Sequence, residues 1–88
     1  MSKLDDPSGV ELGRATVVRA RDTETLDGPN PLIDLEITIS VGNRPPYTVA
    51  RREPVPRVYL GRVAPGASVP VSVNPTDPTD IAILWSRP

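Results

Sequence analysis

The 88-residue chain contains no cysteine and no histidine. The first absence excludes disulfide bonds and thiol nucleophiles, and the two together exclude zinc sites of the usual cysteine–histidine kind. Without histidine, the side chain that most often moves protons near neutral pH is also missing. We therefore expect the protein not to be an enzyme.

Aromatic residues are scarce as well, with no phenylalanine and only Tyr47, Tyr59 and Trp85. The core must be built from valine, isoleucine and leucine, and the β-branched members of this group favour strands. No apolar run approaches the roughly 20 residues that a membrane-spanning helix needs, and the first residues lack the apolar segment of a signal peptide. These features predict a cytoplasmic protein without a membrane span.

The chain also lacks an excess of positive charge. Ten lysine and arginine residues stand against eleven aspartate and glutamate residues, which gives a formal net charge of −1. Proteins that bind nucleic acids usually have a basic excess, because the phosphate backbone dominates their affinity. Nucleic acid is therefore a possible partner but not the favoured one.

Proline, by contrast, is abundant, with twelve residues in this short chain. Proline interrupts helices and ladders, so its frequency predicts short elements separated by turns. We predict a flexible N-terminal tail over residues 1–10 and a single domain over residues 11–88.

Alternation of apolar and polar residues predicts the strands. In LIDLEITISV, residues 32–41, every second residue is apolar, as expected for a strand with one buried face. A first strand is predicted over residues 11–21, followed by a polar hairpin loop over residues 22–30. Further strands are predicted over residues 47–53, 68–73 and 81–85. Because Pro70 cannot donate to a ladder, its strand is expected near an edge of the sheet or at a bulge.

One apolar segment does not alternate. Its apolar and long side chains follow helical spacing, which predicts a helix of about two turns between the third and fourth strands. An irregular covering loop is the alternative, since short helices depend on packing for their stability. The residues of the predicted stripe are Val55, Val58, Tyr59, Arg62 and Val63.

The order of elements predicts an all-β fold with one short helix. A five- to six-stranded small barrel with a helix between the third and fourth strands is the OB-like arrangement. An SH3-like barrel is the nearest alternative, and an open five-stranded meander comes third. Trp85 is expected to pack inside the barrel and not to serve as an exposed anchor.

The span from Gly13 to Leu84 resembles uncharacterised small β-barrel proteins of high-GC actinobacteria. The matching segments are GRATVVRARDT, PLIDLEITISV, PPYTVARREPVPRVYLGRVAPG and VPVSVNPTDPTDIAIL. These segments contain turn and core positions, so the resemblance implies a fold and not a reaction. The use of nine arginines and one lysine also suits a high-GC source.

Two groups of acidic residues suggest chemistry, but each has a simpler explanation. Asp34 and Glu36 share one face of a strand, where paired carboxylates can act as acid and base. They also simply keep the outer face of that strand polar, which is the favoured interpretation. Asn74, Asp77 and Asp80 offer oxygen atoms to a calcium ion, yet their Asn-Pro and Asp-Pro context is typical of turns. We therefore predict no catalytic, metal or cofactor site.

Basic and aromatic residues are concentrated in one stretch, and on an OB-like barrel they would form a platform for single-stranded nucleic acid. The alternative is that these arginines only cover a small barrel. The residues of this predicted surface are Tyr47, Arg51, Arg52, Arg57, Tyr59 and Arg62.

The sequence thus predicts a non-catalytic protein-interaction or assembly module without a cofactor or small-molecule substrate. It would bind a protein partner or its own copies through the Pro70 edge strand or the Tyr47 to Arg62 surface. The alternative function is a single-stranded nucleic-acid-binding OB-like module. Binding to nucleic acid would weaken steeply with salt, and binding through apolar or edge contacts would not.

Overall fold

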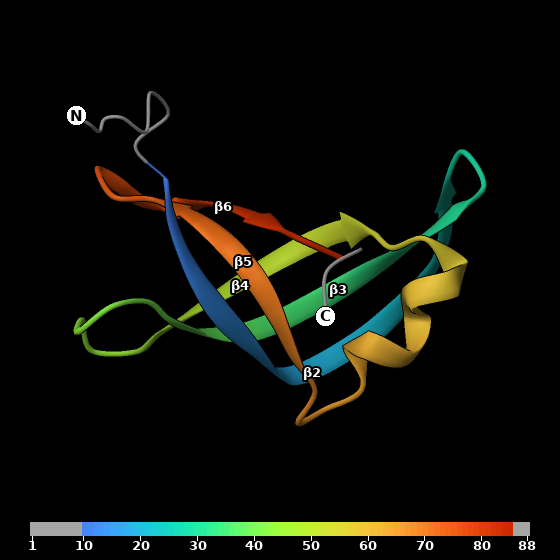
Figure 1. The fold of residues 1–88 in the computed structure, drawn as a ribbon. Helices are drawn as coiled ribbons and strands as arrows, with labels where there is room; N and C mark the ends of the chain where they lie inside the picture. Colours follow the sequence, from blue (N-terminus) through green and yellow to red (C-terminus); the bar gives the residue numbers. More distant parts are fainter. Residues whose placement is uncertain (1–9, 86–88) are drawn as a thin grey trace.

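A computed structural model describes residues 10–85 and has five antiparallel strands and one short helix in this range (Figure 1). The strands follow the sheet order β4-β3-β2-β5-β6 and form a nearly closed barrel, so the predicted small all-β barrel is confirmed. The predicted tail over residues 1–10 lies, apart from Val10, outside the described residues. The elements are β2 (Glu11–Asp27), β3 (Asn30–Ser40), β4 (Tyr47–Pro54), the 3₁₀ helix η1 (Arg57–Val63), β5 (Ser68–Asn74) and β6 (Asp77–Ile83).

The core consists of aliphatic side chains from the predicted inner faces. Alternate residues of β3 are buried with more exposed residues between them, and the same alternation holds in β5. The two strands flank β2 in the sheet, and the short helix contributes further side chains. The buried apolar residues are Ala15, Val17, Ile33, Leu35, Ile37, Ile39, Val41, Val55, Val63, Val69, Val71, Val73 and Ile81.

The first strand is longer than predicted. Where the sequence suggested a loop over residues 22–30, β2 continues to Asp27 and only Gly28 and Pro29 form the turn. The residues of this extension are mostly exposed, so no alternation of apolar and polar residues indicates the strand. The β2–β3 register shifts between Val17 and Arg19 and again between Asp22 and Leu26.

The strand of Pro70 lies near an edge of the sheet order, as predicted, because β5 is next to the end strand β6. It is not an edge strand itself, since β5 pairs with β2 on one side and β6 on the other. The carbonyl of Pro70 accepts a hydrogen bond of 2.9 Å from the amide of Leu84, just beyond the end of β6. In an antiparallel pair the N–H and C=O of one residue face the same neighbour. The side of Pro70 that lacks an N–H therefore faces the chain just beyond the end of β6, where the ladder between β5 and β6 has already ended.

The predicted helix exists but has 3₁₀ geometry, and one residue of its predicted stripe is misplaced. Val58 is 81% exposed, whereas Val55 and Val63 are buried. A 3₁₀ helix has about three residues per turn, so Leu60 and Val63 share its inner side while Val58 lies on another side. Val55 precedes the helix and donates a backbone hydrogen bond of 3.0 Å to Pro31.

The last strand begins earlier than predicted, at Asp77, and its pairing with β5 is interrupted between Asn74 and Val73. Asp77 keeps the predicted turn chemistry, since its carboxylate accepts a hydrogen bond of 3.1 Å from the amide of Thr79. Trp85, which was predicted to lie inside the barrel at the end of the last strand, lies beyond the end of β6 at Ile83 and is half-buried against the core.

Candidate functional site: an arginine-lined hollow

The six residues of the predicted basic and aromatic surface do not lie together. Tyr47 and Arg51 are half-buried on the core side of β4, whereas Arg52 is exposed on its outer side, as alternation along a strand requires. Arg57 is exposed at the start of η1, and Tyr59 is half-buried against the core. These residues therefore do not form one continuous surface.

Two of these residues join the ends of the sheet. Tyr47 donates a hydrogen bond of 2.8 Å from its hydroxyl to the carbonyl of Pro78, and Arg51 donates one of 2.6 Å to the carbonyl of Ile81. Both bonds connect β4 with β6, the first and last strands in the sheet order. We call this junction the seam. Burial raises the pKa of the Tyr47 hydroxyl, although the charge of Arg44 opposes this shift.

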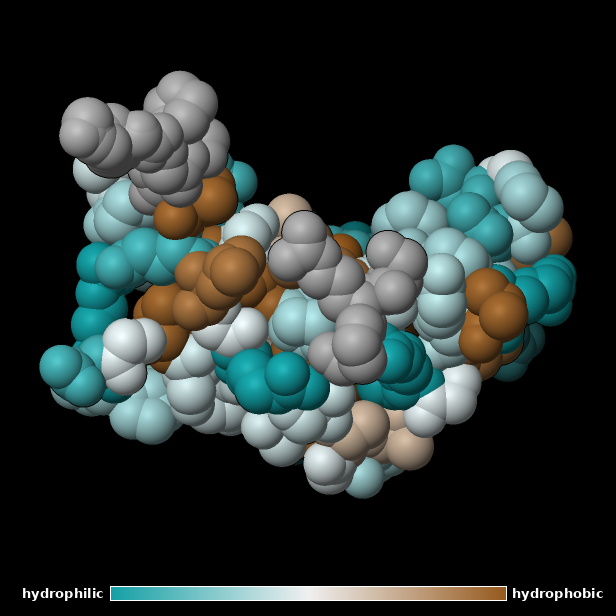
Figure 2. Space-filling view, viewed as in Figure 1, coloured by the Kyte–Doolittle hydropathy of each residue, from teal (hydrophilic) through white to brown (hydrophobic). Residues whose placement is uncertain are grey.

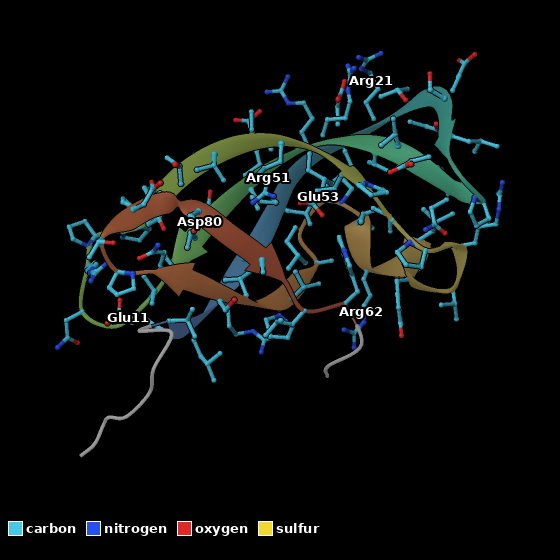
Figure 3. All side chains as sticks on the ribbon, turned by 90° about the horizontal axis from the view of Figure 1, so that it is seen from above. Glu11, Arg21, Arg51, Glu53, Arg62 and Asp80 are labelled. Atoms are coloured by element: carbon cyan, nitrogen blue, oxygen red, sulfur yellow. The ribbon has the colours of Figure 1, made fainter. Side chains whose placement is uncertain are left out.

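A charge pair lies beside the seam. Arg51 Nη2 is 2.7 Å from Glu53 Oε1, and the two side chains are only 28% and 15% exposed. Figure 3 shows both residues on the inner side of the strands, away from Arg21 on the outer surface. Burial raises the pKa of the Glu53 carboxyl, and the nearby Arg51 charge partly offsets this effect. Arg51 and Glu53 therefore hold the barrel together and are not available as a binding surface.

Arg62 also has a structural contact, since its guanidinium donates a hydrogen bond of 3.0 Å to the carbonyl of Trp85. This bond ties the last described residue of the chain to η1. Of the six predicted residues, Arg52 and Arg57 remain exposed.

Arg52 belongs to a different site, a hollow of about 690 Å³ over β2, β3 and β4. We call it the arginine hollow. Arg19 and Arg21 come from β2, Asp34 and Glu36 from the outer face of β3, and Ala50 and Arg52 from the outer face of β4. Because the side chain of Ala50 is small and lies opposite Glu36, it leaves space between larger neighbours. The full lining is Arg19, Arg21, Asp34, Leu35, Glu36, Ala50, Arg51 and Arg52.

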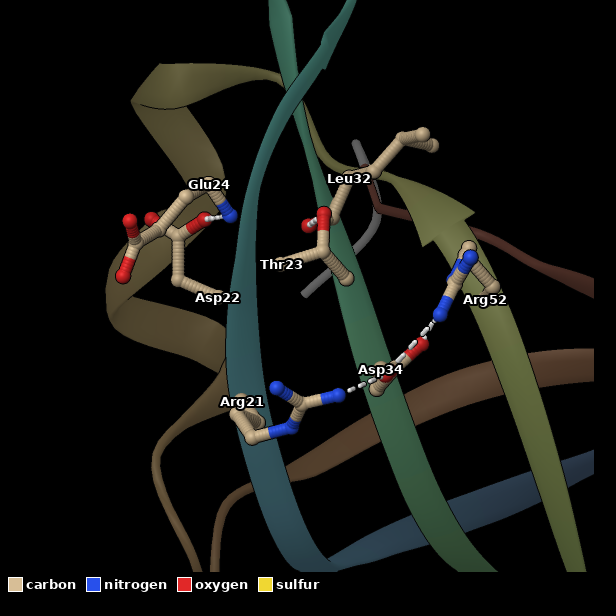
Figure 4. Close-up of polar contacts among 7 residues, drawn as sticks. All are labelled: Arg21, Asp22, Thr23, Glu24, Leu32, Asp34 and Arg52. Carbon is tan, nitrogen blue, oxygen red and sulfur yellow. Dashed lines mark hydrogen bonds and ion pairs between the residues drawn. The ribbon is translucent and has the colours of Figure 1, made fainter.

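One carboxylate organises two arginines of this hollow (Figure 4). Asp34 Oδ1 accepts a hydrogen bond of 2.8 Å from Arg52 Nε, and Asp34 Oδ2 accepts bonds of 2.7 Å from Arg21 and 3.3 Å from Arg52. The hydrogen bond from Arg52, with the smaller effect of Arg21, lowers the pKa of the Asp34 carboxyl. The same bond raises the pKa of Arg52. Both shifts favour the ionised forms of Asp34 and Arg52.

The arginines keep most of their surface in solvent. The side chains of Arg19, Arg21 and Arg52 are 76%, 70% and 60% exposed, and Arg19 forms an ion pair of 3.2 Å with Glu36. A guanidinium has five N–H donors, so Asp34 uses only a part of those that Arg21 and Arg52 offer. Apart from Arg51, which is bound to Ile81 and Glu53, the lining has three arginines and two carboxylates, in a chain whose net charge is −1.

Sequence reasoning missed Arg19 and Arg21. Both belong to β2, and their position opposite Glu36 and Asp34 depends on a register that shifts by one residue near Val17. The repeated spacing of arginine by two residues in RAR was a signal that both share one face of a strand. It did not indicate which neighbouring strand they would meet.

No group of three or more acidic residues is arranged to hold a metal ion within residues 10–85. Asn74 Nδ2 donates a hydrogen bond of 3.3 Å to Asp80, while Asp77 binds the backbone and hydroxyl of Thr79. In the same range, no helix is long and apolar enough to cross a bilayer.

Comparisons of the chain with protein-family models, with curated proteins and with solved structures give no match. A function must therefore be inferred from the residues and geometry of this chain.

Proposed function

We propose that the protein is a non-catalytic protein-interaction or assembly module whose arginine hollow binds an acidic segment of a protein. The observation behind this proposal is that Asp34 fixes two guanidinium groups from neighbouring strands. Their remaining N–H donors suit carboxylates, which arginine binds in a planar two-point geometry. Because Asp34 holds both groups in place, less side-chain entropy is lost on binding.

The strand of Pro70 does not offer an edge to which a partner strand could be added. That strand is covered by neighbours on both sides. The free edges belong to β4 and β6, and side chains from β4 already bind carbonyls of β6. The outer face of β2, β3 and β4 is the more accessible surface.

Binding of single-stranded nucleic acid is the second candidate. It is favoured by the position of the hollow, since OB-like barrels bind oligonucleotides on the face that includes their second and third strands. However, base stacking needs aromatic side chains, and Tyr47 and Tyr59 do not line the hollow. Asp34 and Glu36 repel phosphates and carboxylates alike, so the absence of aromatic side chains from the lining is the feature that favours a protein partner.

Catalysis by the carboxylates of the hollow has little support. A general acid needs a pKa near the working pH, whereas the pKa of Asp34 is lowered and its carboxylate is occupied by two arginines. We also place the module in the cytoplasm, since its lack of cysteine suits a reducing compartment.

The proposal can be tested by fluorescence anisotropy with a labelled glutamate-rich peptide and a labelled oligothymidine of equal charge. We expect the peptide to bind, with affinity reduced about two- to fivefold by Arg21→Ala or Arg52→Ala, as for an exposed charge pair worth up to about 1 kcal/mol. The matched control is Arg57→Ala, an exposed arginine outside the hollow.

Equal peptide affinity in all variants would overturn the proposed site. If only the oligonucleotide bound, and the hollow variants and salt weakened it, the nucleic-acid alternative would replace the protein-partner proposal.

A further inference from the structure

The β2–β3 hairpin extends beyond the barrel as an arm, which we define as residues 22–30. The molecule measures 45 × 26 × 22 Å, and Figure 1 shows the hairpin turn at one end of its long dimension. Every residue of the arm is exposed except Thr23 and Asn30, which are half-buried. A two-stranded ribbon has little stability of its own in water, so an exposed arm gains from contact with another surface.

The arm is acidic and has one exposed apolar residue. It contains Asp22, Glu24 and Asp27 and no lysine or arginine, while Leu26 is 55% exposed. Figure 2 shows mainly hydrophilic residues over the lobe that this hairpin forms. The charge of the arm is therefore opposite to that of the arginine hollow.

The shape of the arm is fixed internally. Glu24 has a positive φ of 63°, and its amide donates a hydrogen bond of 2.8 Å to the Asp22 carboxylate. Thr23 donates a bond of 2.9 Å from its hydroxyl to the carbonyl of Leu32 (Figure 4). These contacts hold the bulge between Asp22 and Leu26, where the ladder is interrupted. The arm therefore already has a fixed shape before it binds.

The arm and the hollow are neighbours on the same strand, since Arg21 directly precedes Asp22 and Arg19 is two residues before Arg21. Two copies related by a two-fold axis can therefore exchange contacts, with each arm on the other copy's hollow. Such an interface is self-complementary and closed, which is the commonest form of assembly.

Resting on the proposed function, we propose that the acidic segment bound by the arginine hollow is the arm of a second copy of this chain. The pair chosen to test this dimer is Asp27, an exposed carboxylate of the arm, with Arg52 of the second copy, a guanidinium of the hollow that is 60% exposed. Leu26, which is 55% exposed, offers an apolar contact beside Asp27. Because the interacting charges are exposed, the dimer is weak and sensitive to salt.

Sedimentation equilibrium of the full chain tests this proposal at concentrations up to about 1 mM, a range that detects millimolar dissociation constants. We expect the mean mass to rise toward twice the monomer mass at low salt. It should return to the monomer mass at about 1 M salt, where the screening length is about 3 Å.

Charge reversal identifies the contact. Asp27→Arg and Arg52→Glu should each abolish the dimer, because each variant has two repulsive contacts in a symmetric pair. An equimolar mixture of the two variants should restore the dimer. In the mixed pair, one contact has both charges exchanged and is attractive again, and the other contact is the native one. If the amide NMR spectrum of Arg52→Glu shows unfolding, the comparison of Asp27→Arg with its control Asp80→Arg decides the contact. Asp80→Arg and Arg57→Glu are matched controls outside the contact and should leave the dimer unchanged.

A native protein that stays monomeric at every concentration would overturn the dimer, as would a mixture that fails to associate. Neither result would affect the proposed function, which is decided separately by the binding of the glutamate-rich peptide and its loss in the arginine variants.

Discussion

Arg51 donates a hydrogen bond of 2.6 Å from its guanidinium to the main-chain carbonyl of Ile81, and so joins the two end strands of the sheet. An arginine on the core side of a strand is unusual, because charged side chains are rarely buried without a partner. Here Glu53 supplies the opposite charge at 2.7 Å and the β6 backbone supplies an acceptor. A side chain thus takes the place of a backbone ladder between β4 and β6.

Replacing this arginine should weaken the barrel. Arg51→Met keeps most of the side-chain volume but removes the bond to Ile81 and leaves the Glu53 carboxylate without its cation. We expect the free energy of unfolding to fall by about 1.5–3 kcal/mol, the range for hydrogen bonds to charged groups. Urea unfolding measures this change, and Arg57→Met, at an exposed position, should change stability by less than about 0.5 kcal/mol. Equal effects of the two substitutions would contradict the role of the seam.

The Glu53 carboxyl should make stability depend on pH. Burial raises its folded-state pKa above 4.5, so the folded protein holds this proton more tightly than the unfolded chain. Its stabilising contribution is complete below pH 4.5 and is lost as the pH rises through the folded-state value. The free energy of unfolding of the native protein, compared with that of Glu53→Gln, should therefore fall as the pH rises through the folded-state pKa. Urea unfolding at a series of pH values measures this difference. If the native protein instead became more stable than Glu53→Gln as the pH rises, the charge of Arg51 would have a larger effect on the pKa of Glu53 than burial has.

Asp34 should have the opposite pH dependence. Its hydrogen bonds with Arg52 and Arg21 lower the folded-state pKa below 3.8, so the ionised form is favoured by folding. The advantage of the native protein over Asp34→Asn should be complete above pH 3.8 and disappear as the pH falls through the folded-state value. Thermal unfolding across this range measures the difference, and Asp80→Asn serves as a control outside the hollow. An advantage that persists at the lowest pH would contradict the ion-pair network.

Gly13 should not tolerate a larger residue. A β-carbon at this position would lie 2.5 Å from the carbonyl oxygen of Ser40 and 3.0 Å from Cβ of Val41. Because Gly13 is paired with Val71 of β5 and lies against the backbone of Ser40 and Val41 at the end of β3, Gly13→Ala must displace backbone, and we expect a loss of about 1–3 kcal/mol. At Gly61 a β-carbon would meet nothing within 4 Å, so Gly61→Ala is the matched control. Chemical denaturation compares the two, and a tolerated Gly13→Ala would contradict the close approach.

Sequence patterns predicted those parts of the fold in which one face is buried. The alternation around Ile37 and Val71 placed two strands correctly because burial of one face imposes a period of two. The arm was missed because both of its faces are exposed and no such period exists. Val58 was misplaced because the helix has three residues per turn, which a pattern of 3.6 does not represent.

The candidate site was predicted less well than the fold. Alternation already placed Arg51 and Arg52 on opposite faces of one strand, but proximity in the sequence had grouped them as one surface. Arg21 and Asp34 meet only through strand pairing, and the register of β2 includes bulges that no local pattern indicates. A site built from three strands therefore becomes visible only in the folded chain.

The most direct test of the arginine hollow is an amide NMR titration of the labelled protein with the glutamate-rich peptide, at a protein concentration low enough to keep it monomeric. We expect the largest shifts at residues of the hollow, including Arg21, Ala50 and Arg52, with little change at Arg57 or Asp80. Shifts elsewhere on the barrel, or shifts that only the oligothymidine produces, would contradict binding of an acidic protein segment at this site.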